Sequence, residues 1–266
     1  MTTVHTLASG SSGNAVLLSC DGTHLLIDAG ISCRRITTSL DQLGLTVADL
    51  TAVLITHTHT DHVSGLQTLL KRGTFPVRAT PRACRELEYR FAGLSDRLEP
   101  LDPCRPAEIG CCTVTAIPTS HDAPGSCGFR VDTASGSAGL LTDTGYVTDE
   151  AAEQLSGVDL AVLEANHDIE TLRSGPYPYY LKQRILGLGG HLSNDDAAAF
   201  AAALAESGTL EIVLAHLSRE NNTPAMARTA VETALAAAGM APTLSVAPRD
   251  TLSRAHVVQR SAVCRK

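Results

Sequence analysis

Three histidines and one aspartate lie within six residues of this sequence, and these residue types bind metal ions. His57, His59, Asp61 and His62 directly follow the apolar run Val53–Ile55, which is typical of a buried strand. Imidazole is the commonest protein ligand for borderline metals, and carboxylate suits the harder ones. One open catalytic metal usually takes three protein ligands, so four ligands in one loop leave a surplus. The stretch therefore predicts a site with a second metal ion.

Further candidate ligands stand where other predicted strands end. His121, Asp143 and His216 each come shortly after an apolar segment, and Asp28 closes another. A single residue of this kind is more often a helix cap or a turn residue. In a layered fold, however, the loops after the strands can bring several polar side chains to one place. Beside the histidine-rich stretch, these residues are therefore candidate ligands of a two-metal site.

Short apolar runs and amphipathic stretches alternate along the chain and predict an α/β protein. The predicted strands span residues 15–20, 24–28, 52–56, 77–80, 112–117, 129–133, 138–142, 159–164, 210–215 and 244–247. The predicted helices span residues 33–43, 62–71, 81–91, 181–187, 194–206 and 224–238. Asn194 is the expected N-cap of helix 194–206, and Gly239 is expected to end the last helix.

Both halves of the chain repeat the same strand-then-helix rhythm, and no long linker separates them. We therefore expect residues 1–266 to form a single domain, an αββα four-layer sandwich with two sheets face to face and helices outside. A hydrophobic content of 44% is enough for a substantial core. Residues 261–266 are expected to form a frayed tail.

Composition limits the kinds of binding partner and the cellular compartment that we expect. The net charge of −7 argues against a broadly basic surface for nucleic acid, although a local basic groove could accompany the metal site. The sequence has no run of about 18 apolar residues and no secretory signal, so we expect a cytoplasmic protein without a membrane span. The eight cysteines form no C-x-x-C pair, which disfavours a zinc ribbon and predicts reduced thiols.

The candidate ligands resemble those of the metallo-β-lactamase superfamily, and the resemblance extends from Leu7 to about Ala238. It implies the metallo-β-lactamase fold and two divalent metal ions, Zn²⁺ or Mn²⁺, with iron also compatible. The implied ligands are His57, His59 and His121 for one ion, Asp61, His62 and His216 for the other, and Asp143 as a bridge between them. Asp28 matches a supporting aspartate of the superfamily, expected to hold a ligand in place.

Two residues outside this set indicate a branch of the superfamily. Glu164 in Leu163–Asn166 and His191 in Gly190–Ser193 resemble the acidic residue and the histidine of phosphodiesterases such as RNase Z. In that branch a hydroxide between two cations attacks phosphorus, and the Glu/His pair protonates the leaving oxygen. The resemblance implies catalytic roles for Glu164, His191 and Asp61. Taken alone, a Gly-His pair before a helix could equally be loop structure.

Three segments carry the closest resemblance, which is to the YycJ/WalJ subfamily. They are LASGSSGN at 7–14, EANHD at 164–168 and HLSRENNTP at 216–224. The resemblance implies a DNA exonuclease, with nucleic acid as the substrate and no membrane partner. The candidate substrate contacts in these segments are Ser9, Ser11, Ser12, Asn14, His167, Arg219, Asn221 and Asn222.

These contacts have simpler alternatives. The loop 9–14 could offer N–H groups and hydroxyls to a phosphate, or it could simply be a tight turn. Asn221 and Asn222 could cap the following helix, and the role of His167 stays open. The nearest basic candidates for phosphates are Lys182, Arg184 and Arg219, and the candidates for stacking on bases are Tyr177, Tyr179 and Tyr180. Alternatively, the basic residues are simply solvated and the tyrosines simply pack against the protein.

Two other classes of function stay open. One is a small-molecule hydrolase acting on a cyclic phosphodiester, thioester, lactone or β-lactam. Glu164 and His191 argue against the carbonyl substrates but do not separate a cyclic phosphodiester from nucleic acid. The other is a non-catalytic regulator, which is disfavoured because no expected ligand is missing. A homodimer is compatible with the sequence.

Overall fold

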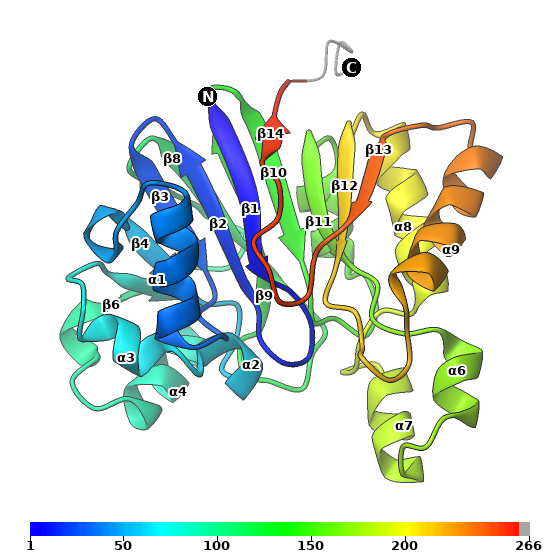
Figure 1. Cartoon of the computed structure of the whole chain (residues 1–266), viewed down its shortest axis with the longest axis horizontal. Coiled ribbons are helices and arrows are strands. Elements are labelled where there is room, and N and C mark those ends of the chain that lie inside the picture. Colours follow the sequence, from blue (N-terminus) through cyan, green and yellow to red (C-terminus); the bar gives the residue numbers. More distant parts are fainter. Residues whose placement is uncertain (261–266) are drawn as a thin grey trace.

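The computed structural model describes residues 1–260, so the tail expected at 261–266 lies outside the described residues. Two seven-stranded sheets lie face to face, and helices cover their outer faces (Figure 1). The predicted αββα four-layer sandwich is confirmed by this arrangement.

Each sheet is built from one half of the chain, and the first sheet also contains the last described strand. The first sheet contains β1 (Thr2–Ala8), β2 (Ala15–Cys20), β3 (Thr23–Ile27), β4 (Ala52–Leu54), β5 (Val77–Ala79), β6 (Leu98–Pro100) and β14 (His256–Val258). The second contains β7 (Pro106–Ile109), β8 (Cys112–Pro118), β9 (Cys127–Thr133), β10 (Gly136–Leu141), β11 (Leu160–Glu164), β12 (Glu211–Ala215) and β13 (Thr243–Val246). β14 pairs with β1, so the last described strand returns to the first sheet.

The helices lie mostly in the connections between strands. They are α1 (Cys33–Gln42), α2 (Thr60–Val63), α3 (Leu66–Leu70), α4 (Pro81–Arg90), α5 (Asp149–Leu155), α6 (Ile169–Ser174), α7 (Tyr179–Leu186), α8 (Asn194–Glu206) and α9 (Pro224–Ala237), with short 3₁₀ turns at Val47–Asp49 and Ser95–Arg97. None of the helices within residues 1–260 combines the length and the hydropathy that crossing a bilayer requires.

The core explains why the strands are apolar on both faces. In β3, Leu25 and Ile27 point into the space between the two sheets, while Leu26 faces the layer of α1, α3 and α4. On the outer side of the second sheet, α5, α8 and α9 form the matching layer. Each fully buried Leu or Ile contributes about 1.5–3 kcal/mol through the hydrophobic effect. Because both faces are covered, the strands lack a polar/apolar alternation.

Strand direction decides where the loops meet. β3 to β6 run parallel to one another, as do β10 to β13. The carboxyl ends of β3 and β4 lie at the same edge of the sandwich as those of β10, β11 and β12, since the residues at these ends contact one another. In Figure 1 this edge is at the bottom, near α2, whereas the N-terminus lies at the top.

Several predicted boundaries are wrong for local reasons. The predicted helix 62–71 is divided into α2 and α3 around Gly65, where a Cβ atom would lie 2.0 Å from the carbonyl oxygen of Ile31. The N-cap of α8 is Ser193, whose hydroxyl accepts a hydrogen bond from the backbone N–H of Asp196 (3.1 Å). The side chain of Asn194, the predicted N-cap, instead bonds Asn222. The sequence prediction lacks the strands β1, β6, β7 and β14 and the helices α5 and α6.

Candidate metal centre

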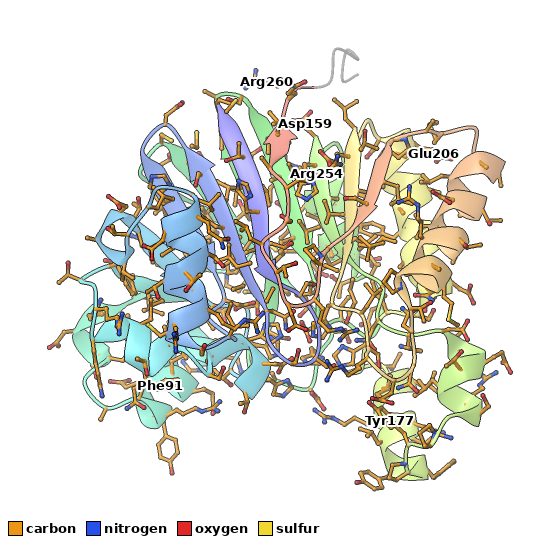
Figure 2. The ribbon with its side chains drawn as sticks, viewed as in Figure 1. Phe91, Asp159, Tyr177, Glu206, Arg254 and Arg260 are labelled. Carbon is orange, nitrogen blue, oxygen red and sulfur yellow. The ribbon has the colours of Figure 1, made fainter. Side chains whose placement is uncertain are left out.

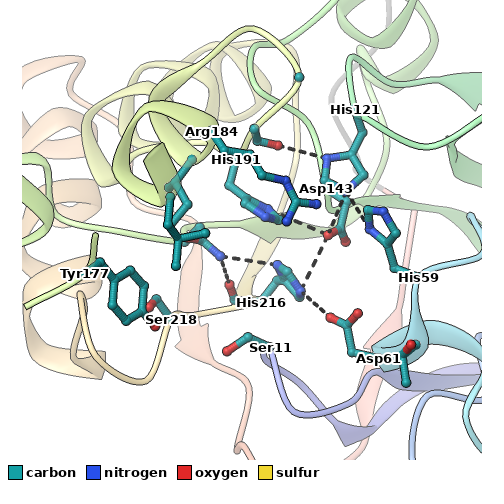
Figure 3. A pocket seen from close by; sticks show the side chains of 16 residues that line it. Ser11, His59, Asp61, His121, Asp143, Tyr177, Arg184, His191, His216 and Ser218 are labelled. Carbon is teal, nitrogen blue, oxygen red and sulfur yellow. Dashed lines mark hydrogen bonds and ion pairs between the residues drawn. The ribbon is translucent and has the colours of Figure 1, made fainter. Parts of the chain in front are cut away.

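The seven predicted ligands come together at the edge where the strands end. Four follow β4, and the others follow β8, β10 and β12; together they are His57, His59, Asp61, His62, His121, Asp143 and His216. A cleft of about 390 Å³ opens over them (Figure 3). Residues that are far apart in the sequence therefore share one site because parallel strands end at one edge.

Three of the strand-end residues adopt a left-handed backbone conformation. The φ angles of Asp28, Asp143 and His216 are 62°, 59° and 55°. Aspartate and histidine enter this region more readily than most residues with a side chain, but it remains uncommon. Strained backbone of this kind concentrates at functional sites. Here the left-handed conformation lets the backbone turn sharply after each strand while the side chain stays at the site.

The first ligand group contains His57, His59 and His121. One ring nitrogen from each histidine lies within 4.8 Å of the other two, and His59 Nδ1 is 3.2 Å from His121 Nε2. The remaining nitrogens have other contacts: His57 Nδ1 lies 3.0 Å from the Thr56 hydroxyl, and His121 Nδ1 donates to the carbonyl of Gly190 (3.0 Å). These contacts leave Nε2 of His57 and His121 facing the centre of the group.

The second ligand group contains Asp61, His62 and His216. Asp61 Oδ2 is 3.5 Å from Nε2 of His62 and 3.5 Å from Nε2 of His216. Asp28 lies behind this group and binds Nδ1 of His62 at 2.7 Å. Asp28 also accepts a hydrogen bond from the backbone N–H of Thr56 at 2.9 Å. This geometry places Asp28 where a supporting aspartate would hold the ring of His62.

Asp143 lies between the two groups. Its Oδ2 is 3.3 Å from His62 Nε2, and its Oδ1 is 3.6 Å from His216 Nε2 and 3.8 Å from His121 Nε2. Asp143 Oδ2 and His57 Nε2 are buried and have no hydrogen-bond partner within the described residues. An unpaired buried polar atom costs about 1–3 kcal/mol. Cations in the two groups would satisfy both atoms, so the residues present fit a metal centre.

The two groups differ in their electrostatics. Burial, with the neighbouring histidines, lowers the pKa of His57 well below its usual value, and burial lowers the pKa of His59 as well. For His216, burial opposes the charged form, but Asp143, Asp61 and Glu164 outweigh it and raise the pKa to about 10. The pKa of His62 is raised for the same reason, by Asp143 and Asp28 against burial.

Glu164 links the second group to His191. Its Oε1 lies 2.8 Å from Nδ1 of His191 and 2.9 Å from Nδ1 of His216. Burial disfavours the Glu164 carboxylate, but His191 and His216 outweigh burial and hold its pKa well below the usual range. The same residues could be read as a further cation site. The short carboxylate–imidazole contacts favour a hydrogen-bonded chain, since each of these nitrogens already has a carboxylate partner.

The structure divides the candidate substrate contacts of the loop 9–14. Ser11 lines the cleft (Figure 3), whereas Ser12 is exposed and lies outside the cleft lining. Ser9 is buried, and its hydroxyl accepts a hydrogen bond from the backbone N–H of His216 (2.8 Å). Asn14 is buried and places Nδ2 3.1 Å from His62 Nε2. Only Ser11 among the four is therefore placed to meet a substrate.

The other candidate contacts also lie outside the cleft lining. Arg219 is exposed. Asn222 is buried and donates to the carbonyl of Ala165 (2.9 Å) and to Asn194 Oδ1 (2.8 Å), while Asn221 is fully buried beside Ser218. His167 is buried, and neither ring nitrogen has a hydrogen-bond partner in the described chain. The geometry gives Asn221 and Asn222 internal hydrogen bonds instead of the predicted substrate contacts.

The segment that contains α6 and α7 forms one wall of the cleft, and the sequence did not predict this wall. Between β11 and α8 the chain departs from the sandwich into α6 and α7, and this excursion brings Tyr177 and Arg184 to the cleft (Figures 2 and 3). Arg184 makes two bonds to the carboxylate of Asp122, at 2.5 and 3.1 Å. Asn166 and Ser218, which the sequence offered only as parts of longer motifs, also line the cleft. Lys182 instead donates to a backbone carbonyl of α6.

Comparison with known families and proteins agrees with this geometry. The family model described as the β-lactamase superfamily domain matches residues 23–217. Exodeoxyribonuclease WalJ of Streptococcus pneumoniae is 38% identical over 237 residues, which cover 88% of each chain. The chain belongs to the WalJ/YycJ family of the β-lactamase superfamily. Exodeoxyribonuclease YycJ of Bacillus anthracis is 35% identical over 230 residues, or 86% of this chain and 87% of the relative.

Solved structures support the fold. The metallo-β-lactamase fold protein YhfI of Bacillus subtilis superposes with a TM-score of 0.71 over 95% of this chain and 99% of its own, at 17% identity. At this identity the likeness carries the fold alone. The predicted superfamily, its WalJ/YycJ branch and the prediction of an enzyme are confirmed by the family and sequence matches.

Proposed function

We propose that this protein is a metal-dependent exodeoxyribonuclease that hydrolyses phosphodiester bonds from an end of DNA. The observation that carries the proposal is the site itself: two ligand groups joined by Asp143, with the Glu164–His191 pair beside them. The extended identity to WalJ and YycJ, both exodeoxyribonucleases by name, supports the choice of DNA as substrate.

The proposed cofactors are two divalent cations, one in each ligand group, with Asp143 shared. Bound there, they would supply Lewis acidity and lower the pKa of a water molecule. Histidine nitrogens and carboxylate oxygens together suit Zn²⁺ or Mn²⁺, and iron as well. We also place the protein in the cytoplasm, because the seven described cysteines are all free, which is typical of a reducing compartment.

The residues of the chain then have separate roles. Asp61, on the cleft side of the second group, would orient the attacking water by accepting a hydrogen bond. Glu164 holds Nδ1 of His191, which leaves Nε2 of His191 available at the cleft, where His191 is a lining residue. The Glu164 carboxylate holds the His191 ring in place through this contact, and Nε2 of His191 would donate a proton to the leaving oxygen. Such proton transfer contributes about 10²–10⁴-fold to a rate.

Substrate binding would use the groups that the cleft offers. Ser11 could donate to a phosphate oxygen, and the ring of Tyr177 could stack on a base. Arg184 would contribute positive charge beside the ligand groups, although Asp122 compensates part of it. The cleft thus combines a local cation with an aromatic ring on a chain of net charge −7.

The test is an assay with end-labelled single- and double-stranded DNA and RNA, using protein with Zn²⁺ or Mn²⁺ and a His59→Ala variant. Stepwise loss of nucleotides from one DNA end, absent in the variant, is the expected result. Absence of cleavage by protein that demonstrably holds both metals would reject the nuclease. Cyclic phosphodiesters and thioesters would then be the substrates to test.

A further inference from the structure

A cluster of three cysteines lies at the edge of the sandwich opposite the metal centre. Cys20 is the last residue of β2, a strand that begins next to the cleft loop and extends about 17 Å away from it. Cys111 and Cys112 lie where β7 turns into β8, whose other end leads to His121. The cluster therefore joins the end of β2 in the first sheet to the turn between β7 and β8 and the first residue of β8 in the second.

Two hairpin turns bring these cysteines together. In the first sheet Cys20 pairs with Thr23 across the turn Asp21-Gly22, and in the second Ile109 pairs with Cys112 across Gly110-Cys111. The turns touch: the backbone N–H of Cys111 donates to the Thr23 hydroxyl at 3.0 Å. The Cys111 thiol also lies 3.0 Å from the carbonyl oxygen of Cys20. The cluster is thus built by tertiary contact between residues about 90 positions apart in the chain.

The sulfur positions fit a tetrahedral cation. All three Sγ atoms lie within 4.8 Å of one another, and those of Cys111 and Cys112 are 4.0 Å apart. Zinc bound to thiolates at about 2.3 Å places the sulfurs about 3.8 Å apart, so only a small movement is needed. Cys20 and Cys112 are buried, whereas Cys111 is exposed and gives the cluster an entrance from solvent.

We propose that Cys20, Cys111 and Cys112 form a structural site for a thiophilic divalent cation such as Zn²⁺, with water as the fourth ligand. Binding forms three metal–sulfur bonds and releases three thiol protons, without any change in oxidation state. The Thr23 hydroxyl lowers the pKa of Cys111, whereas burial raises the pKa of Cys20 and Cys112. Since thiolate is the form that binds a metal, a bound cation would displace all three thiol protons. The bound ion would tie the two sheets together at their far edge.

Cobalt(II) substitution tests this site independently of the proposed nuclease, because no cysteine belongs to the ligand groups of the metal centre. Thiolate–Co²⁺ bonds absorb in the near ultraviolet, and imidazole or carboxylate bonds do not. We expect this absorption, together with about one equivalent of zinc beyond the content of the metal centre, in the unmodified chain. Both should be lost in Cys111→Ser and in Cys112→Ala.

The matched control is Cys104→Ser, which changes another exposed cysteine outside the cluster. This variant should keep the absorption and the additional equivalent, and Cys111→Ser should keep the activity of the metal centre. The proposal is overturned if Cys111→Ser retains the near-ultraviolet absorption, or if the unmodified chain lacks it. A disulfide within the cluster of protein purified without oxygen, detected by mass spectrometry, would also overturn it.

Discussion

The two ligand groups of the metal centre use similar residues but have opposite proton chemistry. His57, His59 and His121 face one another, and burial keeps His57 and His59 neutral. His62 and His216 instead lie against carboxylates that raise the pKa of both rings. His57 and His59 therefore offer free nitrogen lone pairs at neutral pH, while His62 and His216 hold protons that a cation must displace.

The raised pKa values of the second group follow from the carboxylates that surround its histidines. Asp28 contacts Nδ1 of His62, and Glu164 contacts Nδ1 of His216. Asp61 and Asp143 lie near the Nε2 atoms of both rings. In the metal-free chain, protonated histidines balance these negative charges. A cation takes over that balance, and the same carboxylates then orient the neutral rings toward it.

The largest expected effect is on kcat, and it tests whether His191 is a proton donor or a metal ligand of the second group. His191→Ala should lower kcat by about 10²–10⁴-fold, because it removes the proposed proton donor but no proposed ligand. The metal content, measured by elemental analysis, should stay at that of the unmodified chain. If one metal ion is lost instead, His191 is a ligand, and the comparison of the two groups has to be redrawn. His191→Gln, which cannot become a cation, serves as a second variant.

Much of this site could be predicted because its residues follow strands. The apolar run Val53–Ile55 predicts a strand, and His57 to His62 follow it directly. Asp143 and His216 also follow apolar runs of this kind. Physical reasons explain the failures. β1 was missed because its threonines and histidine look exposed, although Thr2, His5 and Thr6 are buried. Thr2 bonds Thr133 of the second sheet, and His5 and Thr6 lie against Ser253.

Burial of polar residues also explains why some predicted substrate contacts are wrong. Asparagines in a loop are usually solvated, so Asn221 and Asn222 looked available to a substrate. The structure instead uses Asn222 to join β11 to α8. The excursion of α6 and α7 was similarly hidden, because only tertiary structure brings Arg184 to Asp122. Local patterns predicted the ligands, whereas long-range contacts decide what surrounds them.

A second prediction sharpens the comparison through Asp28, which contacts His62 of the second group directly and reaches His57 of the first group only through the Thr56 hydroxyl. Asp28→Asn should weaken metal affinity at the second group by about 10–100-fold, since such supporting carboxylates have effects of that size. The affinity of the first group should fall less, because Asp28 reaches it only through the Thr56 hydroxyl. Competition with a chelator, resolved into two binding steps, measures both. Asp49→Asn is the control, because it removes a carboxylate that bonds Thr46 far from both ligand groups. Equal weakening of both steps would contradict the separation of the groups.

The pH dependence should also differ between the groups. With the pKa of His216 raised to about 10, affinity at the second group should rise about tenfold per pH unit for each proton displaced. Affinity at the first group should change little above pH 6.5, the usual pKa of histidine. In the metal-free chain the sign reverses: His216 stabilises the fold fully below 6.5, and this contribution is lost as pH rises through about 10. Chelator competition and urea unfolding across this range measure the two trends.

The smallest effect concerns His167, a buried histidine that belongs to neither group. Burial lowers its pKa to about 4, so it is neutral at pH 7, and neither ring nitrogen has a partner in the described chain. Leucine has a similar volume and no polar atom to desolvate. His167→Leu should therefore change the free energy of unfolding by no more than about 1 kcal/mol at pH 7.

The same variant should matter more in acid. A histidine with a lowered pKa in the folded state destabilises the fold as pH falls from 6.5 toward 4, because the unfolded chain takes up a proton first. His167→Leu should remove that part of the loss, as measured by urea unfolding at several pH values. Its nuclease activity should stay unchanged, because His167 lies outside the cleft lining. A large loss of kcat with an unchanged fold would mean that the neutral ring contributes to catalysis, and the contrast between ligating and non-ligating histidines would not hold.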